Sequence, residues 1–264
     1  MIQVEGIFAG GATKPYIEET YNSAGNLIDV KMHGYTKIRD YAFSDCYDLA
    51  LTSLPDEIVS IGMNAFRSCF SLALTSLPTG ITSIGSGAFY NCESIALTSL
   101  PSGISSIENA AFSDCINLAL TNLPSGITRI GNSAFYRCTN LALTSLPDGL
   151  TSIENSAFEE CDNLALTSLP DGLTSIGGYA FGGCYNMTLT SIPSGVTSIG
   201  MRSFLTCDGL TSLTFMGTPT SIAPDAFEFC ENLTTINVPW AEGAVANAPW
   251  GATNATIHYN YTGG

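Results

Sequence analysis

The nine cysteines of the chain stand at positions 46, 69, 92, 115, 138, 161, 184, 207 and 230, and every step between them is 23 residues. This constant spacing constrains the fold more than any other feature of the sequence. A fixed period of this length indicates a stack of like supersecondary units rather than a globular core that folds once. In such a solenoid the periodic residues build the scaffold, so we expect specificity where the sequence departs from its period.

One unit of the repeat, residues 138–160, predicts two short extended segments joined by a tight turn. Leu141, Leu143 and Leu146 are separated by small or polar residues, which is typical of a strand with one inward face. The sequence Pro-Asp-Gly at 147–149 predicts the turn, because proline fixes its own φ and glycine adopts the positive φ that other residues avoid. The second extended segment follows directly.

The unit closes through residues 155–158, Asn-Ser-Ala-Phe. We expect a single helical or 3₁₀ turn here, capped by Asn155 or Ser156 through a backbone N–H. Each unit then makes one coil, and its inward Leu, Ile, Ala, Phe and Cys side chains are buried by the coils above and below. Phenylalanine recurs at positions 43, 66, 89, 112, 135, 158, 181, 204 and 227, which predicts an aromatic ladder through the core.

The repeat pattern Asn-Leu-x-Leu-Thr-Ser-Leu-Pro-x-Gly-Ile-Thr-Ser-Ile-Gly-x-x-Ala-Phe-x-x-Cys resembles the BspA-like leucine-rich repeats. The match spans about residues 35 to 239, and many of its positions recur in nearly every unit. The resemblance implies an α/β repeat fold, a right-handed leucine-rich-repeat solenoid with a parallel β-sheet on one face and short helical or 3₁₀ turns. It also implies binding or adhesion rather than catalysis, since members are common on microbial surfaces and in pathogens.

A solenoid needs caps because its open ends expose sheet edges and core. Residues 16–21 and 27–32 flank a turn-forming segment and predict a β-hairpin in an N-terminal cap, residues 1–34. The segment 35–238 then holds about nine 23-residue units of the solenoid.

The C-terminal cap is expected over residues 239–264. Residues 239–252 contain both tryptophans and predict a short helix that packs the indoles over the last coil, and residues 255–261 predict a final strand. With the two caps, the chain is expected to form one continuous structural domain. Its two ends also resemble repeat proteins encoded in prophage structural regions of gut Firmicutes.

The charge of the chain argues against two classes of partner. The formal net charge is −15, from 23 acidic and 8 basic residues, and no lysine follows Lys37. Binding to nucleic acid or to an anionic membrane surface requires a basic surface, so neither is expected. No stretch approaches the roughly 20 apolar residues of a membrane span. The opening residues 1–6 lack a basic region followed by a long apolar one, so no secretory signal is expected there.

The cysteine ladder is interpreted as structural. Coils about 4.8 Å apart leave disulfides possible on distance alone, since their Cα separations run from about 4.4 to 6.8 Å. Each cysteine follows phenylalanine at a fixed offset, as a core residue would, and free cysteine is among the most buried residue types. Metal binding is disfavoured because Cys-x-x-Cys pairs and nearby histidines are missing. The ladder expected to be buried and reduced is Cys46, Cys69, Cys92, Cys115, Cys138, Cys161, Cys184, Cys207 and Cys230.

No pattern indicates an enzyme, and no catalytic residue, metal ligand or cofactor is assigned. His33 and His258 stand in opposite caps, on the order of 40 Å apart at sheet spacing, so they cannot act together. Glu159, Glu160 and Asp162 form a group of carboxylates, but a convex repeat surface offers no cleft for a glycosidase pair. This group is interpreted as a solvated acidic patch.

Two columns of hydroxyl side chains recur on the predicted strands. Threonine stands at 52, 75, 98, 121, 144, 167 and 190, and in a second column at 82, 128, 151, 174, 197 and 220. Flat ladders of this kind could bind ice or glycans. The β-propensity and solubility of an exposed strand favour the same residues without any ligand.

The most informative columns are those that vary, beside each cysteine and before each Ala-Phe pair. Tyrosine, arginine and phenylalanine are the residue types most used as binding anchors. They give a candidate partner-binding surface of Tyr47, Arg67, Phe70, Tyr90, Tyr136, Arg137, Tyr179, Tyr185, Arg202 and Phe229. The alternative is variation at exposed positions where packing imposes nothing.

Two non-enzymatic functions are therefore hypothesised. The first is a binding or adhesion module that presents a rigid, extended surface to a protein or glycan partner. The second is a structural or host-recognition component of a phage-like particle. The family resemblance suggests a cell-surface or secreted location, and the second hypothesis a virion-associated one; the ligand and the oligomeric state are not encoded in the pattern.

Overall fold

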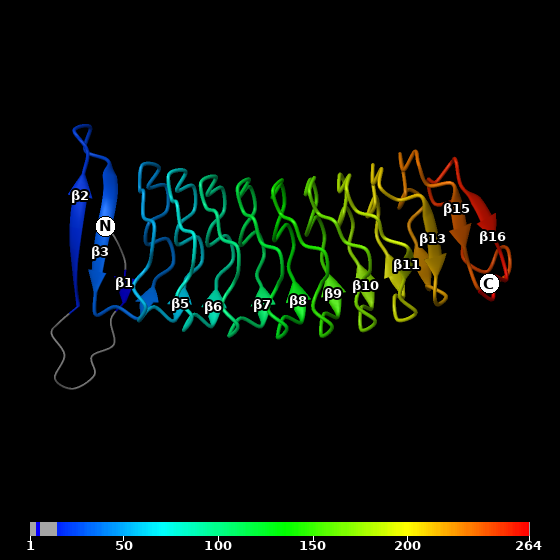
Figure 1. Cartoon of the computed structure of the whole chain (residues 1–264), viewed down its shortest axis with the longest axis horizontal. Helices are drawn as coiled ribbons and strands as arrows, with labels where there is room; N and C mark the ends of the chain where they lie inside the picture. The colour runs from blue at the N-terminus through cyan, green and yellow to red at the C-terminus, as the bar shows by residue number, and fades with distance from the viewer. Residues whose placement is uncertain (1–3, 6–14, 264) are drawn as a thin grey trace.

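Successive coils lie side by side along one long axis, with a hairpin at one end and the last strands at the other (Figure 1). The computed structural model describes residues 4–5 and 15–263. The opening segment, for which no secretory signal is expected, lies outside the described residues except for Val4–Glu5. Neighbouring coils are joined by parallel strand pairs, so the fold is a parallel-sheet β-solenoid.

Most strands are two residues long and recur with the 23-residue period. They are β4 (Lys37–Ile38), β5 (Ser60–Ile61), β6 (Ser83–Ile84), β7 (Ser106–Ile107), β8 (Arg129–Ile130), β9 (Ser152–Ile153), β10 (Ser175–Ile176), β12 (Ser198–Ile199) and β14 (Ser221–Ile222). In each of these strands the isoleucine is buried. Where neighbouring strands pair, it stands opposite the isoleucine of the next coil. The register is therefore fixed by the core, since a one-residue slip would expose every isoleucine.

This ladder is interrupted between β6 and β7, which belong to different sheets. Gly62 and Gly85 follow the two strands before the break, and a Cβ on either would lie 2.5–2.6 Å from the backbone of the preceding coil. The next coil carries Glu108 at this position instead of glycine. Glu154 stands at the same position in a later coil and keeps its bond to the Ile130 carbonyl, at 3.1 Å.

The strand expected at Leu141–Leu146 is not a regular strand. Its backbone still contacts the preceding coil, since the Ala142 N–H donates to the Leu120 carbonyl at 3.2 Å. Among the described coils that follow the N-terminal hairpin, regular strands occur on this side only near the C-terminus. They are β11 (Ser191–Ile192), β13 (Ser212–Phe215), β15 (Thr235–Asn237) and β16 (Thr256–His258), paired in that order and in parallel.

Each coil closes through consecutive turns, and the described residues contain no helix. In one coil the Ala65 N–H donates to the Gly62 carbonyl and the Cys69 N–H to the Phe66 carbonyl, at 3.4 and 3.1 Å. The third residues of these turns, Asn64 and Ser68, have φ of 51° and 56°, as in type II turns. The expected helical or 3₁₀ turns are thus not confirmed, and turns supply the connections in this part of the fold.

The turns also bond from coil to coil through their side chains. Asn155 was expected to cap its own turn, but its Oδ1 accepts the backbone N–H of Gly178 in the next coil, at 2.7 Å. Asn132 bonds to the N–H of Asn155 in the same way, at 3.2 Å, and Asp40 to that of Met63, at 2.7 Å. These side chains form a ladder that supports the stacking of the coils.

Nine phenylalanine rings stack along the core. The centroids of neighbouring rings from Phe43 to Phe227 lie 5.0–5.7 Å apart, and their planes agree within 19°. All nine rings are fully buried. Offset stacks of this kind contribute beyond the area that they bury, so the aromatic ladder couples each coil to its neighbours.

The N-terminal end of the solenoid is covered by strands. β2 (Tyr16–Tyr21) and β3 (Leu27–His33) form an antiparallel hairpin, and β1 (Val4–Glu5) pairs antiparallel with β4. The carbonyl of Ile28 in β3 accepts the Ala50 N–H at 2.9 Å, as Leu51 does for Ala73 in the next coil. The hairpin strand β3 therefore takes the place of a preceding coil.

The C-terminal end is covered by an irregular coil rather than the expected helix at 239–252. Its Trp250 is fully buried and packs against Phe215 and Trp240, with ring centroids 6.0 and 6.2 Å away. The Trp250 carbonyl accepts the Phe227 N–H at 2.9 Å, as the Ala226 carbonyl does for Phe204. The two indoles cover the last coil, but turns hold them there.

Candidate functional site

The cysteine ladder lies inside the solenoid, away from any surface site. All nine thiols are free; eight are buried and Cys46 is half-buried. Each buried Sγ–H, from Cys69 to Cys230, donates to the phenylalanine carbonyl of the preceding coil at 2.9–3.1 Å. Burial raises the pKa of these thiols, to about 12 for Cys230. The thiolate is the reactive form, so the ladder is chemically quiet at neutral pH.

The residues around each cysteine form one edge of the solenoid, here called the turn rim. It comprises the two positions before each cysteine and the one after it. The position directly before cysteine has positive φ in all nine coils, at Asp45, Ser68, Asn91, Asp114, Arg137, Glu160, Gly183, Thr206 and Phe229. Glycine, asparagine and aspartate tolerate this conformation best, so the backbone does not explain the arginine, threonine and phenylalanine found there.

Two predicted anchors stack on each other near the N-terminal end of the turn rim. The rings of Tyr47 and Phe70 have centroids 5.2 Å apart and an interplanar angle of 11°. They remain 52% and 37% exposed. An exposed stack of two large rings offers apolar area that loses little conformational entropy when a partner covers it.

Arg67 and Tyr90 form a second pair in the next coils. The Arg67 guanidinium lies 5.5 Å from the centroid of the Tyr90 ring, which is cation–π geometry. Both line a depression of about 260 Å³ together with Met63, which is 39% exposed. The depression is small, and it places an apolar side chain beside a cation.

The arginines farther along the turn rim are held by carboxylates. Arg137 pairs with Asp114 and Glu160, at 3.3 and 3.1 Å. The pKa of neighbouring Tyr136 is raised, first by burial and then by Glu160 and Glu159. Glu160 pairs with Arg137, and both Glu160 and Glu159 act on Tyr136. Together with Asp162, these glutamates make the middle part of the rim acidic.

Arg202 lies in a comparable cluster toward the C-terminus. Its Nε donates to Glu228 at 2.8 Å and lies 3.4 Å from Asp225, and its Nη1 donates to the Tyr179 hydroxyl at 3.0 Å. Hydrogen bonds from Arg202 to Tyr179 and Glu228 raise the pKa of the arginine. The structure thus brings Tyr179 and Arg202 together, while Tyr185 and Phe229 project separately, 46% and 61% exposed.

Large exposed apolar side chains gather toward the two ends of the solenoid. Those of the first part of the chain are Tyr16, Tyr21, Tyr41, Tyr47, Val59, Met63 and Phe70, and those of the last part are Tyr185, Met201, Met216, Phe229 and Tyr261. Between Phe70 and Tyr185 the described residues include only Ile116 in this class. The large exposed apolar side chains therefore form two separate groups, and Tyr136 and Arg137 of the predicted surface lie between them in the sequence.

Sequence reasoning missed a charged cluster on the strand side. Arg129 replaces the serine of its strand column, and its guanidinium contacts Glu154 at 2.5 Å and Glu108 at 3.4 Å. Both glutamates stand where five other coils have glycine after the strand. Asn109 also accepts from Arg129, at 3.3 Å. The sequence signal for this cluster is that two columns depart from the period in neighbouring coils. Arginine replaces serine at 129, and glutamate replaces glycine at 108 and 154.

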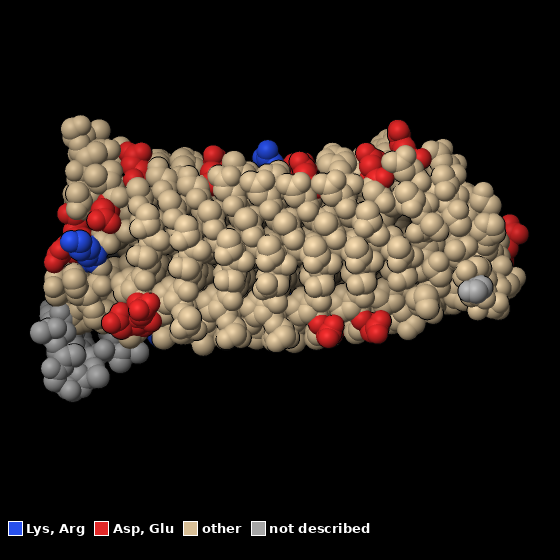
Figure 2. All heavy atoms as spheres, in the orientation of Figure 1, with Lys and Arg blue, Asp and Glu red and all other residues tan. Residues whose placement is uncertain are grey.

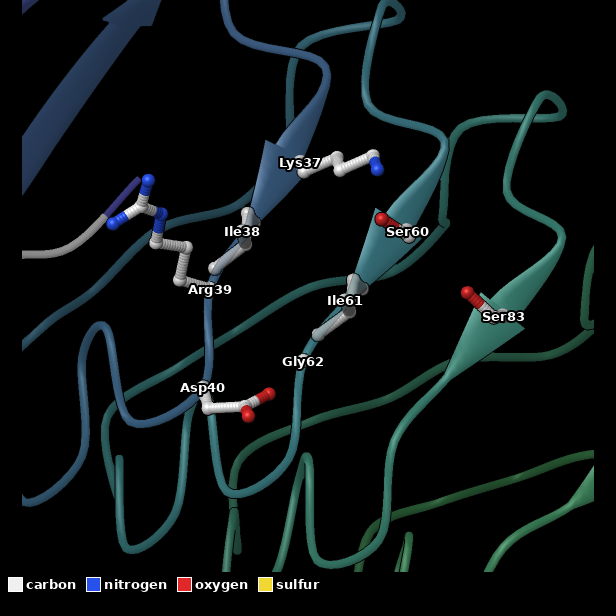
Figure 3. A pocket seen from close by; sticks show the side chains of 8 residues that line it. All are labelled: Lys37, Ile38, Arg39, Asp40, Ser60, Ile61, Gly62 and Ser83. Carbon is white, nitrogen blue, oxygen red and sulfur yellow. The ribbon is translucent and has the colours of Figure 1, made fainter. Parts of the chain in front are cut away.

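A depression of about 510 Å³ lies on the strand side of the first coils. Figure 3 shows Lys37, Ser60 and Ser83 on neighbouring strands, with the Asp40 carboxylate near Gly62. Asp40 is already bonded to the backbone of the next coil. Besides Asp40, the polar groups that line this open depression are the Lys37 ammonium, the Arg39 guanidinium and the hydroxyls of two serines.

The side of the coils that carries Thr52 is uncharged. None of the nine segments equivalent to residues 49–54 contains Asp, Glu, Lys or Arg, and the threonine and serine at 52–53 are exposed. Figure 2 shows a broad face of the coils without charged side chains, bordered by charges along two opposite edges. The second threonine column differs, because hydroxyls such as Thr174 Oγ1 donate to the carbonyl of the preceding coil, here Thr151 at 2.9 Å.

The remaining titratable residues do not converge. His33 stacks on Tyr16 with centroids 4.3 Å apart and lies 3.5 Å from Glu18, while His258 is exposed in β16 at the other end. Within residues 4–5 and 15–263, no three His, Cys, Asp or Glu side chains are grouped to hold a metal ion. The same residues contain no helix long and apolar enough to cross a membrane.

The chain resembles bacterial leucine-rich repeat proteins in sequence and structure. A model of the BspA type leucine rich repeat region, in six copies, matches residues 18–142 and 128–242. A T. pallidum leucine-rich repeat protein is 27% identical, with a TM-score of 0.51 over 65% of this chain and 87% of that one. A comparison with curated proteins gives no match.

Two further solved structures show the same fold at lower identity. The pneumococcal vaccine antigen PcpA is 20% identical, with a TM-score of 0.50 over 84% of this chain and 71% of that one. A leucine-rich repeat protein from Eubacterium ventriosum is 21% identical, with a TM-score of 0.50 over 86% of this chain and 64% of that one.

Proposed function

Because the chain belongs to the BspA-type leucine-rich repeat family, we propose that it is a non-enzymatic binding module that presents its turn rim to a protein partner. The leucine-rich repeat fold is typical of protein-binding modules. The observation that carries the proposal is the exposed Tyr47–Phe70 stack beside the Arg67–Tyr90 pair. Rigid aromatic and arginine side chains of this kind dominate binding energies at protein interfaces.

The rest of the scaffold supports this use of the turn rim. Its core is stacked and its thiols are bonded internally, so the coils form a rigid support. Rigid presentation lowers the entropy that is lost on binding. By analogy with neighbours such as the pneumococcal antigen, we place the chain at a cell surface or outside the cell. A role in a phage-like particle remains a hypothesis without an observation of its own.

The test uses a displayed peptide library panned on the immobilised chain. Peptides enriched on the wild type are expected to bind the double variant Tyr47→Ser/Phe70→Ser at least tenfold more weakly, since two anchors are lost. The matched control is Thr75→Ala/Thr98→Ala, which changes two exposed side chains on the uncharged face. Equal binding by the wild type and the ring variant would remove the turn rim as the site.

The uncharged face gives a second candidate function, binding of a neutral glycan or of ice. The observation that favours it is the row of exposed, uncharged hydroxyl side chains, one coil apart along the solenoid. Binding to neutral polysaccharides and thermal hysteresis of freezing are the two measurements. Thr144→Lys, in the middle of the face, is expected to abolish whichever activity is present; absence of both in the wild type would discard this candidate.

A further inference from the structure

Phe229 is a bulky apolar side chain at a position where the fold imposes a positive φ in every coil. Its backbone has φ of 59°, and its ring is 61% exposed. The equivalent residues in the other eight coils are polar, charged or glycine. A bulky residue at positive φ is an outlier, and such outliers concentrate at functional sites. The surroundings of the ring therefore bear on its role.

The ring borders a depression that arises because the last coil is short. In the preceding coil Asn232 stands six positions after Ala226, and both residues bond to the coil before them. In the last coil the corresponding Asn254 stands only four positions after Trp250. The missing backbone leaves a depression of about 530 Å³, lined by Glu228, Phe229, Cys230, Glu231, Gly251, Thr253 and Asn254.

The chemistry of the lining is that of a site for a cation with an apolar stem. The Phe229 ring supplies a face for cation–π contact, and the exposed Glu231 lies two residues farther along the rim. Glu228 adds a second carboxylate, which is shared with Arg202 at 2.8 Å. No lysine or arginine lines the depression, so an incoming cation meets only a ring, carboxylates and neutral polar groups.

We propose that this depression binds the arginine side chain of an extended basic peptide. The guanidinium would stack on Phe229 and donate to the Glu231 carboxylate, and the apolar stem would fill the depression. The excess of acidic residues over the whole chain favours the approach of such a peptide. This inference names the partner chemistry for one end of the turn rim and so rests on the proposed binding function.

The test follows backbone amide resonances during titration with acetyl-Gly-Arg-Gly-amide. We expect saturable shifts confined to residues 228–231 and 251–254, and none with acetyl-Gly-Glu-Gly-amide. Phe229→Asn and Glu231→Gln are each expected to raise the Kd for the arginine probe about fivefold or more. No saturable shift at millimolar probe, or an unchanged Kd in Phe229→Asn, would overturn the proposal.

The Phe229→Asn variant carries its own check on folding. Asparagine tolerates positive φ better than phenylalanine, so the variant is expected to be at least as stable as the wild type while it loses probe affinity. Ile116→Ser, which changes an exposed apolar residue in the middle of the rim, serves as the control and should bind the probe unchanged. If the arginine probe binds but no library peptide depends on Tyr47 and Phe70, the proposed function is refuted and this inference stands. If library peptides depend on Tyr47 and Phe70 but the arginine probe does not bind, this inference is refuted and the proposed function stands.

Discussion

At the scale of single residues, Ser203 is a departure from period that weakens the core. Alanine occupies this position in the other eight coils, and the Ser203 hydroxyl is buried without a hydrogen-bond partner. A buried polar group without a partner costs about 1–3 kcal/mol. Ser203→Ala is therefore expected to raise the free energy of unfolding in urea by about 1–2 kcal/mol, and the matched Ala180→Ser should lower it. A loss of stability in Ser203→Ala would contradict the interpretation that the Ser203 hydroxyl is buried without a partner.

Cys46 is the residue at which the cysteine ladder meets solvent. It is half-buried, and burial and then the charge of Asp45 raise the pKa of its thiol above the usual value. Native labelling with iodoacetamide is expected to modify Cys46 first and to leave the other eight unreactive until the chain unfolds.

The pH dependence of this labelling follows from the direction of the pKa shift. Because only the thiolate reacts and the pKa of Cys46 is raised, the rate at Cys46 should still rise with pH where the rate of a free cysteine, with a pKa of about 8.5, levels off. Mass spectrometry of labelled peptides measures both effects. Rapid native labelling of several cysteines would show that the ladder is not closed to solvent.

The residue scale also shows what the sequence could predict. The period alone predicted the stacked phenylalanines and the burial of Cys69 to Cys230, because a residue that repeats every 23 positions meets its own copy in the next coil. It did not predict that Arg129 would bridge Glu108 and Glu154, since that contact joins three columns whose angular positions depend on the turns. The sequence shows that the residues beside each cysteine vary, but it does not show that the residue directly before cysteine has a positive φ.

At the scale of elements, the interactions that hold neighbouring coils together are partly side-chain bonds to backbone. Asn155 Oδ1 accepts the Gly178 N–H, and the Asp40 carboxylate does the same for Met63 in the first coils. Asn155→Ala is expected to lower the free energy of unfolding by about 1 kcal/mol, because the Gly178 donor loses its partner. Asn155→Asp keeps an acceptor and should retain most of the stability in chemical denaturation. Equal losses in both variants would show that the acceptor is not what matters.

The elements are also where sequence reasoning about the fold was least successful. Of the two extended segments expected, the second, at 150–153, contains the regular strand Ser152–Ile153, whereas the first, Leu141–Leu146, is not a regular strand. The helical turn expected at 155–158 is a pair of turns. Alternation of apolar residues identifies the inward face, but the backbone conformation between the faces is set by hydrogen bonds to the adjacent coils. The same reason explains the C-terminal cap, where both indoles pack as expected on a coil of turns.

At the scale of the whole molecule, stability depends on coupling between neighbouring coils, so the position of a core mutation should matter as much as its size. Phe135 stacks between Phe112 and Phe158, at 5.7 and 5.4 Å, whereas Phe43 has a ring neighbour on one side, Phe66 at 5.1 Å. Replacing either ring by alanine removes about 3–5 kcal/mol of packing. In a linear array of repeats, a central loss uncouples the two flanking halves, while a terminal loss frays one end.

Native-state hydrogen exchange and urea unfolding distinguish these outcomes. Phe135→Ala is expected to unfold in two transitions, with amides on either side of the coil at 135 losing protection at different urea concentrations. Phe43→Ala should keep one main transition and lose protection only in the first coils, where the hairpin strand β3 and Asp48, bonded to Asn22 and Asn26, still cover the end. A single, uniform transition in Phe135→Ala would mean that the coils are coupled over distances longer than one neighbour. In that case the rigidity that the turn rim requires would belong to the solenoid as a unit, and the two exposed groups at its ends would be held at a fixed separation.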